Sequence, residues 1–379
     1  MKHNIINPNF NFINEPIEFN KFSDRKILQY CLGATLYMPG TKHVIDKILN
    51  KKLLGLTSMV MCFEDAIKEE DLKAAEKNVI KHLDTLSTAI EAGNITHNDI
   101  PLTFLRVRNT EQFWQFSKKL KKEHCEILSG FVFPKFYSSN GNEYFSCLSE
   151  LISKFNIQLY GMPILEGRDV AFKETRLEEL IKLRVLMLPF KELVLNIRVG
   201  GTDLSSLFGV RRGINYSIYD ILTVRDCLSD ILNVFNRVNG YVVSAPVWEY
   251  FLAYKNEDLD HLLKDDIHNS LLKRNPILND AIDGLLREVV LDKANGFIGK
   301  TIIHPSHVKY VNAMQAVTKE EWDDAQQIIN TNGGVVKGTN KMNEINPHKN
   351  WAKKIINRGK AFGVIENQSS YFKLFFESK

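Results

Sequence analysis

The sequence predicts an α/β protein built as a (β/α)8 TIM barrel, and three observations favour that fold class. Short apolar segments alternate along the chain with longer segments of helical periodicity. Eight such apolar segments occur, and several are continuously apolar, as expected of strands buried on both faces of a parallel sheet. Polar and charged residues follow their ends, where a barrel builds its active site. An open, doubly wound sheet is the main alternative.

The elements follow from hydrophobic periodicity. Residues 217–238 place most of their apolar side chains on one helical face, and residues 65–86 separate charged from apolar positions in the same way. Two further helices are expected near 318–330 and 347–362. The eight expected strands are 34–38, 58–63, 102–108, 130–133, 157–165, 193–199, 241–244 and 297–303.

Three regions follow from this pattern. Residues 1–26, in which Asn, Pro and Phe alternate, are expected to form an N-terminal arm laid over the surface. Residues 27–316 form the barrel, with inserted segments at about 167–192 and 256–279. Residues 317–379 form a C-terminal helical extension that packs outside the barrel.

Composition excludes several classes of protein. The chain has 379 residues, of which 44% are hydrophobic, so it can bury a sizeable core. Its formal net charge of +4 is small and spread out, which predicts no nucleic-acid partner. The five cysteines are scattered and include no C-x-x-C pair. We see neither a signal peptide nor an apolar run of the ~20 residues that a membrane span requires. We therefore expect a soluble, reduced, cytoplasmic protein.

Reactive side chains gather at the strand ends. Taken singly, each has a plainer explanation: Asp65 could cap the following helix, and Gly200-Gly201 could form an ordinary turn. His304 and His307 are expected in a loop rather than as metal ligands, because Pro305 interrupts any helix between them. The convergence of acids, arginines and a lysine at consecutive strand ends favours an active site. The candidates are Pro39, Gly40, Lys42, Glu64, Asp65, Arg106, Arg108, Lys135, Glu166, Gly201, Thr202, Asp203, Ser244 and Pro246.

This set of side chains predicts metal chemistry. Glu166 and Asp203, on different strands, suit a hard cation such as Mg2+, with Mn2+ as the alternative, which keeps open positions for substrate oxygens. Such a cation would chelate a 2-oxo acid and stabilise the enolate formed when a carbon–carbon bond breaks. An arginine would bind the substrate carboxylate through its fork. A Schiff base on Lys135 is a second possibility, ranked below the metal because a pair of acids is present.

Several segments in chain order resemble the citrate lyase β-subunit / HpcH–HpaI aldolase superfamily, and most of all its longer branch of TIM-barrel C–C bond lyases, found in gene clusters linked to tellurium resistance. The resemblance runs from Leu32 to about Gly363. The segments that carry it are LYMPG at 36–40, MCFEDA at 61–66, RVRN at 106–109, GFVFPK at 130–135, PILE at 163–166, GTDL at 201–204, DGL at 283–285, GFIGKTIIHPSH at 296–307 and KMNE at 341–344.

The resemblance implies a Mg2+-dependent lyase or aldolase that acts on a small oxo or hydroxy acid, free or as an acyl thioester. It implies Glu166 and Asp203 as metal ligands, and it adds Asp283 and Glu344 as candidates for proton transfer. Relatives form trimers and hexamers, so a homo-oligomer is expected.

The remaining roles follow from the chemistry. Arg106 or Arg108 would bind the substrate carboxylate, Glu64 and Asp65 would order water or substrate, and Lys135 would add positive charge. The strand-end residues Pro39, Gly40, Lys42, Gly201, Thr202, Ser244 and Pro246 would contact the substrate.

Two departures from the family pattern leave alternatives open. Gly33 replaces an arginine, and Cys62 replaces the first acid of the second motif. They motivate a catalytically silent barrel that serves as a binding or scaffold subunit. A phosphoenolpyruvate-type phosphoryl-transfer enzyme on the same frame is the other alternative.

Overall fold

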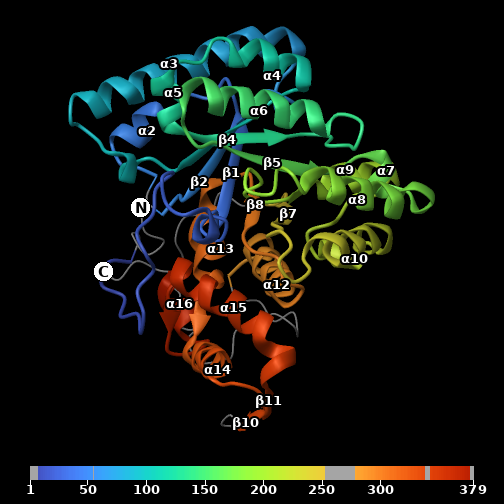
Figure 1. Ribbon diagram of the computed structural model, residues 1–379. Coiled ribbons are helices and arrows are strands. Elements are labelled where there is room, and N and C mark those ends of the chain that lie inside the picture. Colours follow the sequence, from blue (N-terminus) through green and yellow to red (C-terminus); the bar gives the residue numbers. More distant parts are fainter. Residues whose placement is uncertain (1–6, 54, 252–277, 338–341, 376–379) are drawn as a thin grey trace.

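The computed structural model describes residues 7–53, 55–251, 278–337 and 342–375. Eight parallel strands form one sheet in the order β6-β5-β4-β3-β2-β1-β8-β7. The two outermost segments then meet: the Ile197 amide donates to Val242 O at 2.9 Å, and the Ser244 amide donates to Ile197 O at 2.9 Å. The sheet therefore curls into a nearly closed (β/α)8 barrel (Figure 1). Its strands are β1 (Ala34–Pro39), β2 (Ser58–Cys62), β3 (Leu102–Arg106), β4 (Leu128–Phe133), β5 (Tyr160–Leu165), β6 (Arg198–Val199), β7 (Ala245–Trp248) and β8 (Lys300–Ile302).

Helices cover the outside of the barrel. In the longest, α3, four apolar residues spaced three or four apart (Ala75, Val79, Leu83 and Leu86) are buried against the strands. The helices of this layer are α2 (Ile45–Leu49), α3 (Leu72–Glu91), α4 (Thr110–Ser117), α5 (Lys122–Ile127), α6 (Gly141–Phe155), α7 (Arg168–Ala171), α8 (Lys173–Met187), α9 (Gly201–Leu207), α10 (Leu222–Phe235), α12 (Asp280–Ala294) and α13 (Val308–Gln315). Short 3-10 turns occupy Glu69–Asp71, His97–Asp99, Ile218–Asp220 and Pro305–His307.

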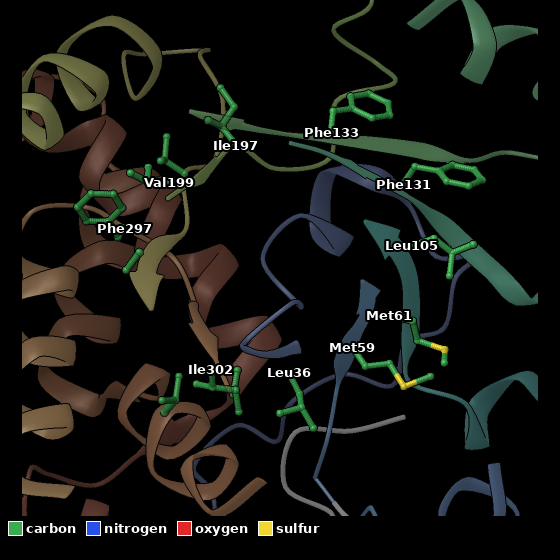
Figure 2. Packing of buried hydrophobic residues seen from close by; sticks show 14 of the residues in the cluster. Leu36, Met59, Met61, Leu105, Phe131, Phe133, Ile197, Val199, Phe297 and Ile302 are labelled. Atoms are coloured by element: carbon green, nitrogen blue, oxygen red, sulfur yellow. The ribbon is translucent and has the colours of Figure 1, made fainter. Parts of the chain in front are cut away.

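Strand alternation divides the core into two parts. Met59, Met61 and Leu105 belong to the cluster between strands and helices (Figure 2), whereas Val60 and Phe104, their neighbours along the strands, belong to a second cluster. This second cluster fills the barrel interior and includes Phe19 and Leu28 from the chain before β1.

The N-terminal segment packs under the barrel. Lys21 donates through Nζ to Cys125 O and, at 2.7 Å, to Leu128 O, where β4 begins. The first helix, α1 (Arg25–Leu28), buries Leu28 in the interior cluster. The expected arm is thus in contact with the end of the barrel where the strands start.

The C-terminal segment has a small core of its own. It consists of β9 (Val317–Thr318), α14 (Lys319–Asn330), β10 (Val335–Lys337), β11 (Met342–Glu344), α15 (Ile345–Phe362), β12 (Val364–Ile365) and α16 (Ser370–Phe375). Helices α14 and α15 pack around Ala325, Ile328 and Ile355. In Figure 1 these helices lie on one side of the barrel, away from α3, α4 and α6.

Some expected boundaries were wrong. The strand expected at 241–244 forms a regular ladder only from Ala245, because the chain makes an isolated bridge to Ile197 where the ring closes. The strand expected at 193–199 is regular only over Arg198–Val199 for the same reason. The segment 167–192, expected as an insertion, forms α7 and α8, and α8 packs between α6 and α10 as the ordinary crossover helix. The second expected insertion, 256–279, lies outside the described residues except for its last two positions.

All five cysteines are free and buried. Among the described residues, no helix combines the length and the apolarity needed to cross a membrane.

Candidate active site

An ion-pair cluster lies at the carboxyl ends of β2 to β5. Arg106, the last residue of β3, points its Nη2 at three carboxylates, with distances of 2.7 Å to Glu64 Oε2, 3.1 Å to Asp65 Oδ2 and 3.1 Å to Glu166 Oε1. The register of β2 and β3 explains why Arg106 reaches Glu64 and Asp65, because Arg106 is paired with Cys62, two residues before Glu64. Parallel strands bring their carboxyl ends to one edge of the barrel.

Lys135 completes this cluster from the end of β4. Its Nζ contacts Glu64 Oε1 and lies 3.5 Å from Asp65 Oδ1. Its backbone amide donates to Glu166 Oε1 at 2.9 Å. Lys135 has a φ of 45°, in the left-handed region that non-glycine residues rarely adopt, and such strain is typical of functional sites.

Asp203 approaches Glu166 from the first turn of α9. Burial raises the pKa of Glu166 to about 8, and the charge of Asp203 adds to the rise while Arg106 opposes it. Burial also raises the pKa of Asp203, helped by the charge of Asp65. The two side chains lie within hydrogen-bonding reach of each other. Two carboxyl groups can adopt that arrangement only if a proton or a cation lies between them.

Two glycines make this approach possible. A Cβ on Gly200 would lie 2.3 Å from Glu166 Oε2, and a Cβ on Gly201 would lie 2.8 Å from the Pro246 side chain. Gly200-Gly201 is thus a close-packed helix start that allows Asp203 to face Glu166.

A cavity of about 420 Å³ opens beside the cluster. Of the expected site residues, Pro39, Asp65, Arg106, Glu166, Gly201, Thr202 and Asp203 line it. Glu64 and Lys135 do not line it, but they form ion pairs with the lining residues Arg106 and Asp65. Asp65 does not cap α3, since that helix begins at Leu72.

The other expected residues lie elsewhere. Arg108 Nη1 donates to Phe63 O at 3.3 Å, and Ser244 Oγ donates to Ile298 O at 2.8 Å. Gly40, Lys42 and Pro246 do not line the cavity. Asp283, on α12, accepts from the Leu278 amide at 2.9 Å. Glu344 lies on β11 in the C-terminal segment and is exposed.

Arg198, Tyr37 and Thr301 also line the cavity, although none of them was among the site residues predicted from the sequence. Arg198 was detectable as the single charged residue within the apolar run 193–199. On a strand whose side chains alternate between barrel interior and helical layer, a charge at such a position signals an interior polar site.

Residues 26–364 match the model of the family described as C-C_Bond_Lyase of the TIM-Barrel fold. The chain belongs to this family. No curated protein matches the sequence.

One solved structure shares the fold of this chain, and a second aligns with it more loosely. CitE from Mycobacterium tuberculosis, solved in complex with magnesium, acetoacetate and coenzyme A, aligns with a TM-score of 0.51 and 16% identity over 87% of this chain and 98% of that chain. Malate synthase from Haloferax volcanii, in a magnesium/glyoxylate complex, aligns with a TM-score of 0.48 and 11% identity over 73% of this chain and 72% of that chain.

The donor set fits a hard divalent cation. Across the described part of the chain, no group of three or more His, Cys, Asp and Glu side chains is arranged to hold a metal. A pair of facing carboxylates is the donor set that Mg2+ uses when it retains several waters or substrate oxygens. Burial raises the pKa of Glu166 and of Asp203, and a neighbouring carboxylate adds to each rise, so a cation between the two groups would stabilise their charged forms.

Proposed function

We propose that this C–C bond lyase is a Mg2+-dependent lyase or aldolase that cleaves or forms a carbon–carbon bond next to a small 2-oxo or 3-hydroxy acid. The observation that carries the proposal is the facing pair Glu166 and Asp203, in a cavity at the carboxyl ends of the strands. These two residues would hold the cation. When bound there, Mg2+ would supply Lewis-acid polarisation of a substrate oxygen.

The surrounding residues would orient the pair. Arg106 and the Lys135 amide both donate to Oε1 of Glu166. Such supporting contacts fix the orientation of a ligating carboxylate. Glu64 forms ion pairs with both Arg106 and Lys135, and these pairs would fix the positions of the two cationic side chains.

Lys135 would supply positive charge near the substrate. Burial alone would lower its pKa, but the hydrogen bond and charge of Glu64 outweigh burial and raise the pKa. The ammonium group therefore keeps its proton at Nζ and can stabilise negative charge that develops on the substrate. Asp283 and Glu344 do not line the cavity of a single chain, so we assign them no role in proton transfer within it.

The test is calorimetric titration of metal-free protein with Mg2+, alone and then with pyruvate, glyoxylate or oxaloacetate. We expect oxo-acid binding only in the presence of Mg2+, and its loss in Asp203→Ala and Glu166→Ala. Loss of a ligating carboxylate should weaken Mg2+ binding by at least about 100-fold. Glu76→Ala is the matched control, because Glu76 on α3 is also buried but accepts from Gln112 and Lys119 in the helical layer.

The titration also separates the rival functions. Absence of Mg2+ binding in the wild-type protein would contradict the proposal and favour a silent binding subunit. Mg2+ binding with a product that retains its carbon skeleton and gains or loses phosphate would favour phosphoryl transfer.

A further inference from the structure

The charges around the cavity are unequally distributed. At the acidic end, four carboxylates (Glu64, Asp65, Glu166 and Asp203) face two cationic side chains, Arg106 and Lys135. Two negative charges remain, which one divalent cation would cancel. With a divalent cation bound and all four carboxylates ionised, the acidic end would be neutral and would need no charge from the substrate.

Arg198 is a separate, uncompensated cation. Its side chain is 1% exposed, and it lines the same cavity from β6. Its fork donates to two hydroxyl groups, Thr35 Oγ1 at 3.0 Å and Thr301 Oγ1. Among the described residues no carboxylate lies within 4.0 Å of it, whereas Arg106 has three.

The remaining contacts of Arg198 do not supply a negative charge. The guanidinium carbon lies 5.7 Å from the centre of the Tyr37 ring. Its buried Nε has no hydrogen-bond partner among the described residues. Hydroxyl groups satisfy donors but leave the charge in place, and burial of an unpaired charge is costly. A buried arginine that lines a cavity without a carboxylate partner is therefore a candidate ligand-binding group.

The shape of the group limits what that ligand can be. A guanidinium presents a planar fork that matches a planar carboxylate through two parallel hydrogen bonds. Because Arg198 is buried inside the barrel, its partner has to be carried by a molecule small enough to enter the cavity. One negative charge balances it.

We infer that Arg198 binds the carboxylate of the substrate, and that the substrate portion held in the cavity is a small 2-oxo acid with a single carboxylate. Thr35 and Thr301 are positioning residues that orient the fork. The inference rests on the proposed function for the presence of Mg2+ and of an oxo acid. It differs from the initial expectation, in which Arg106 or Arg108 bound the carboxylate.

The test uses full-length protein saturated with Mg2+, titrated with pyruvate, with its uncharged analogue pyruvamide, and with the dicarboxylate oxaloacetate. The wild-type protein should bind pyruvate at least about 10-fold more tightly than pyruvamide, because a charge-assisted fork is lost with the amide. Oxaloacetate should gain no further affinity over pyruvate.

Arg198→Met should remove this preference by weakening pyruvate binding at least about 10-fold while leaving pyruvamide within about 3-fold. Its Mg2+ binding in the absence of oxo acid should match the wild type. Arg211→Met, which removes an exposed arginine from the same part of the chain, is the control and should keep the preference. In Arg198→Met the Thr35 hydroxyl keeps a hydrogen bond, because it also accepts from Ser58 Oγ at 3.0 Å. We therefore expect the melting temperature of Arg198→Met to lie within about 3 °C of that of the wild type.

Retention of the preference for pyruvate in Arg198→Met would overturn the inference, and so would much tighter binding of oxaloacetate than of pyruvate. If Arg198→Met does not fold, Arg198→Lys carries the test, since it keeps the charge but loses the fork and should show part of the loss.

A wild-type protein that binds no oxo acid with Mg2+ would contradict the proposed function but still leave Arg198 testable. Metal-free protein would then be heated with acetate and with acetamide. If acetate but not acetamide raises the melting temperature of the wild type, and acetate does not raise that of Arg198→Met, the carboxylate site is upheld. If acetate has the same effect on the wild type and on Arg198→Met, the inference is overturned.

Discussion

The guanidinium of Arg106 donates from Nη2 to Oε1 of Glu166 at 3.1 Å, across 60 residues of sequence. The same nitrogen contacts Glu64 and Asp65, so one buried cation holds three acids from two strand ends. Burial disfavours the charged form of each carboxyl group, and the ion pairs with Arg106 offset that cost. The order of the site therefore depends on Arg106.

Replacement of Arg106 by methionine should destabilise the metal-free protein by about 3–5 kcal/mol, because the acids lose their central counter-ion. Urea unfolding measures the change. Arg108→Met removes only a 3.3 Å hydrogen bond to Phe63 O and should cost less than about 1.5 kcal/mol. If the acids also form the cation site, Mg2+ should stabilise Arg106→Met more than the wild type. Equal stability of the two variants would show that Arg106 does not organise the cluster.

Addition of a methyl group at Gly200 should displace Glu166, since a Cβ there would lie 2.3 Å from Oε2 and 2.4 Å from the Glu166 Cβ. We expect Gly200→Ala to lower the free energy of unfolding by about 1–3 kcal/mol and to weaken Mg2+ binding at least about 10-fold. In Gly213→Ala the new Cβ would lie 3.4 Å from Tyr216, an ordinary contact, so that variant should behave as the wild type. Unchanged Mg2+ affinity in Gly200→Ala would argue against Glu166 as a ligand.

Lys135 should not form an imine with oxo acids. A Schiff base requires a neutral amine, whereas the contacts of Nζ with Glu64 and Asp65 keep it protonated. Treatment with pyruvate and borohydride, followed by mass spectrometry of the Lys135 peptide, should show no added mass, in contrast to an imine-forming aldolase treated in parallel. A trapped adduct on Lys135 would favour the Schiff-base route over the metal.

His307 should make stability depend on pH. Burial, with the neighbouring His304, lowers its pKa from 6.5 to about 4, so the folded protein keeps the ring neutral while the unfolded chain protonates it. The stabilisation is full above pH 6.5 and is lost as pH falls toward 4. Between pH 7.5 and 5.0 the wild type should lose about 1–2 kcal/mol more than His307→Gln.

The comparison with His307→Gln is needed because Glu166, whose pKa is raised, changes stability in the opposite direction over the same range. Parallel pH curves for wild type and His307→Gln would contradict the prediction.

Much of the architecture was readable from the sequence. The barrel followed from the alternation of apolar strands with amphipathic helices, because a strand buried on both faces and a helix buried on one leave different periods in the chain. The positions of Glu64, Asp65, Arg106, Lys135, Glu166 and Asp203 were also predictable, since parallel strands bring their carboxyl ends to one edge.

Only the tertiary structure decided which of these charges are compensated. Sequence order shows that Arg106, Arg108 and Arg198 lie on strands or at their ends, but it does not show which acids surround each. Packing gave Arg106 three carboxylates, turned Arg108 toward a backbone carbonyl, and left Arg198 with hydroxyl groups alone. The physical reason is that the net charge at a site depends on contacts between residues far apart in the chain, which local periodicity does not encode.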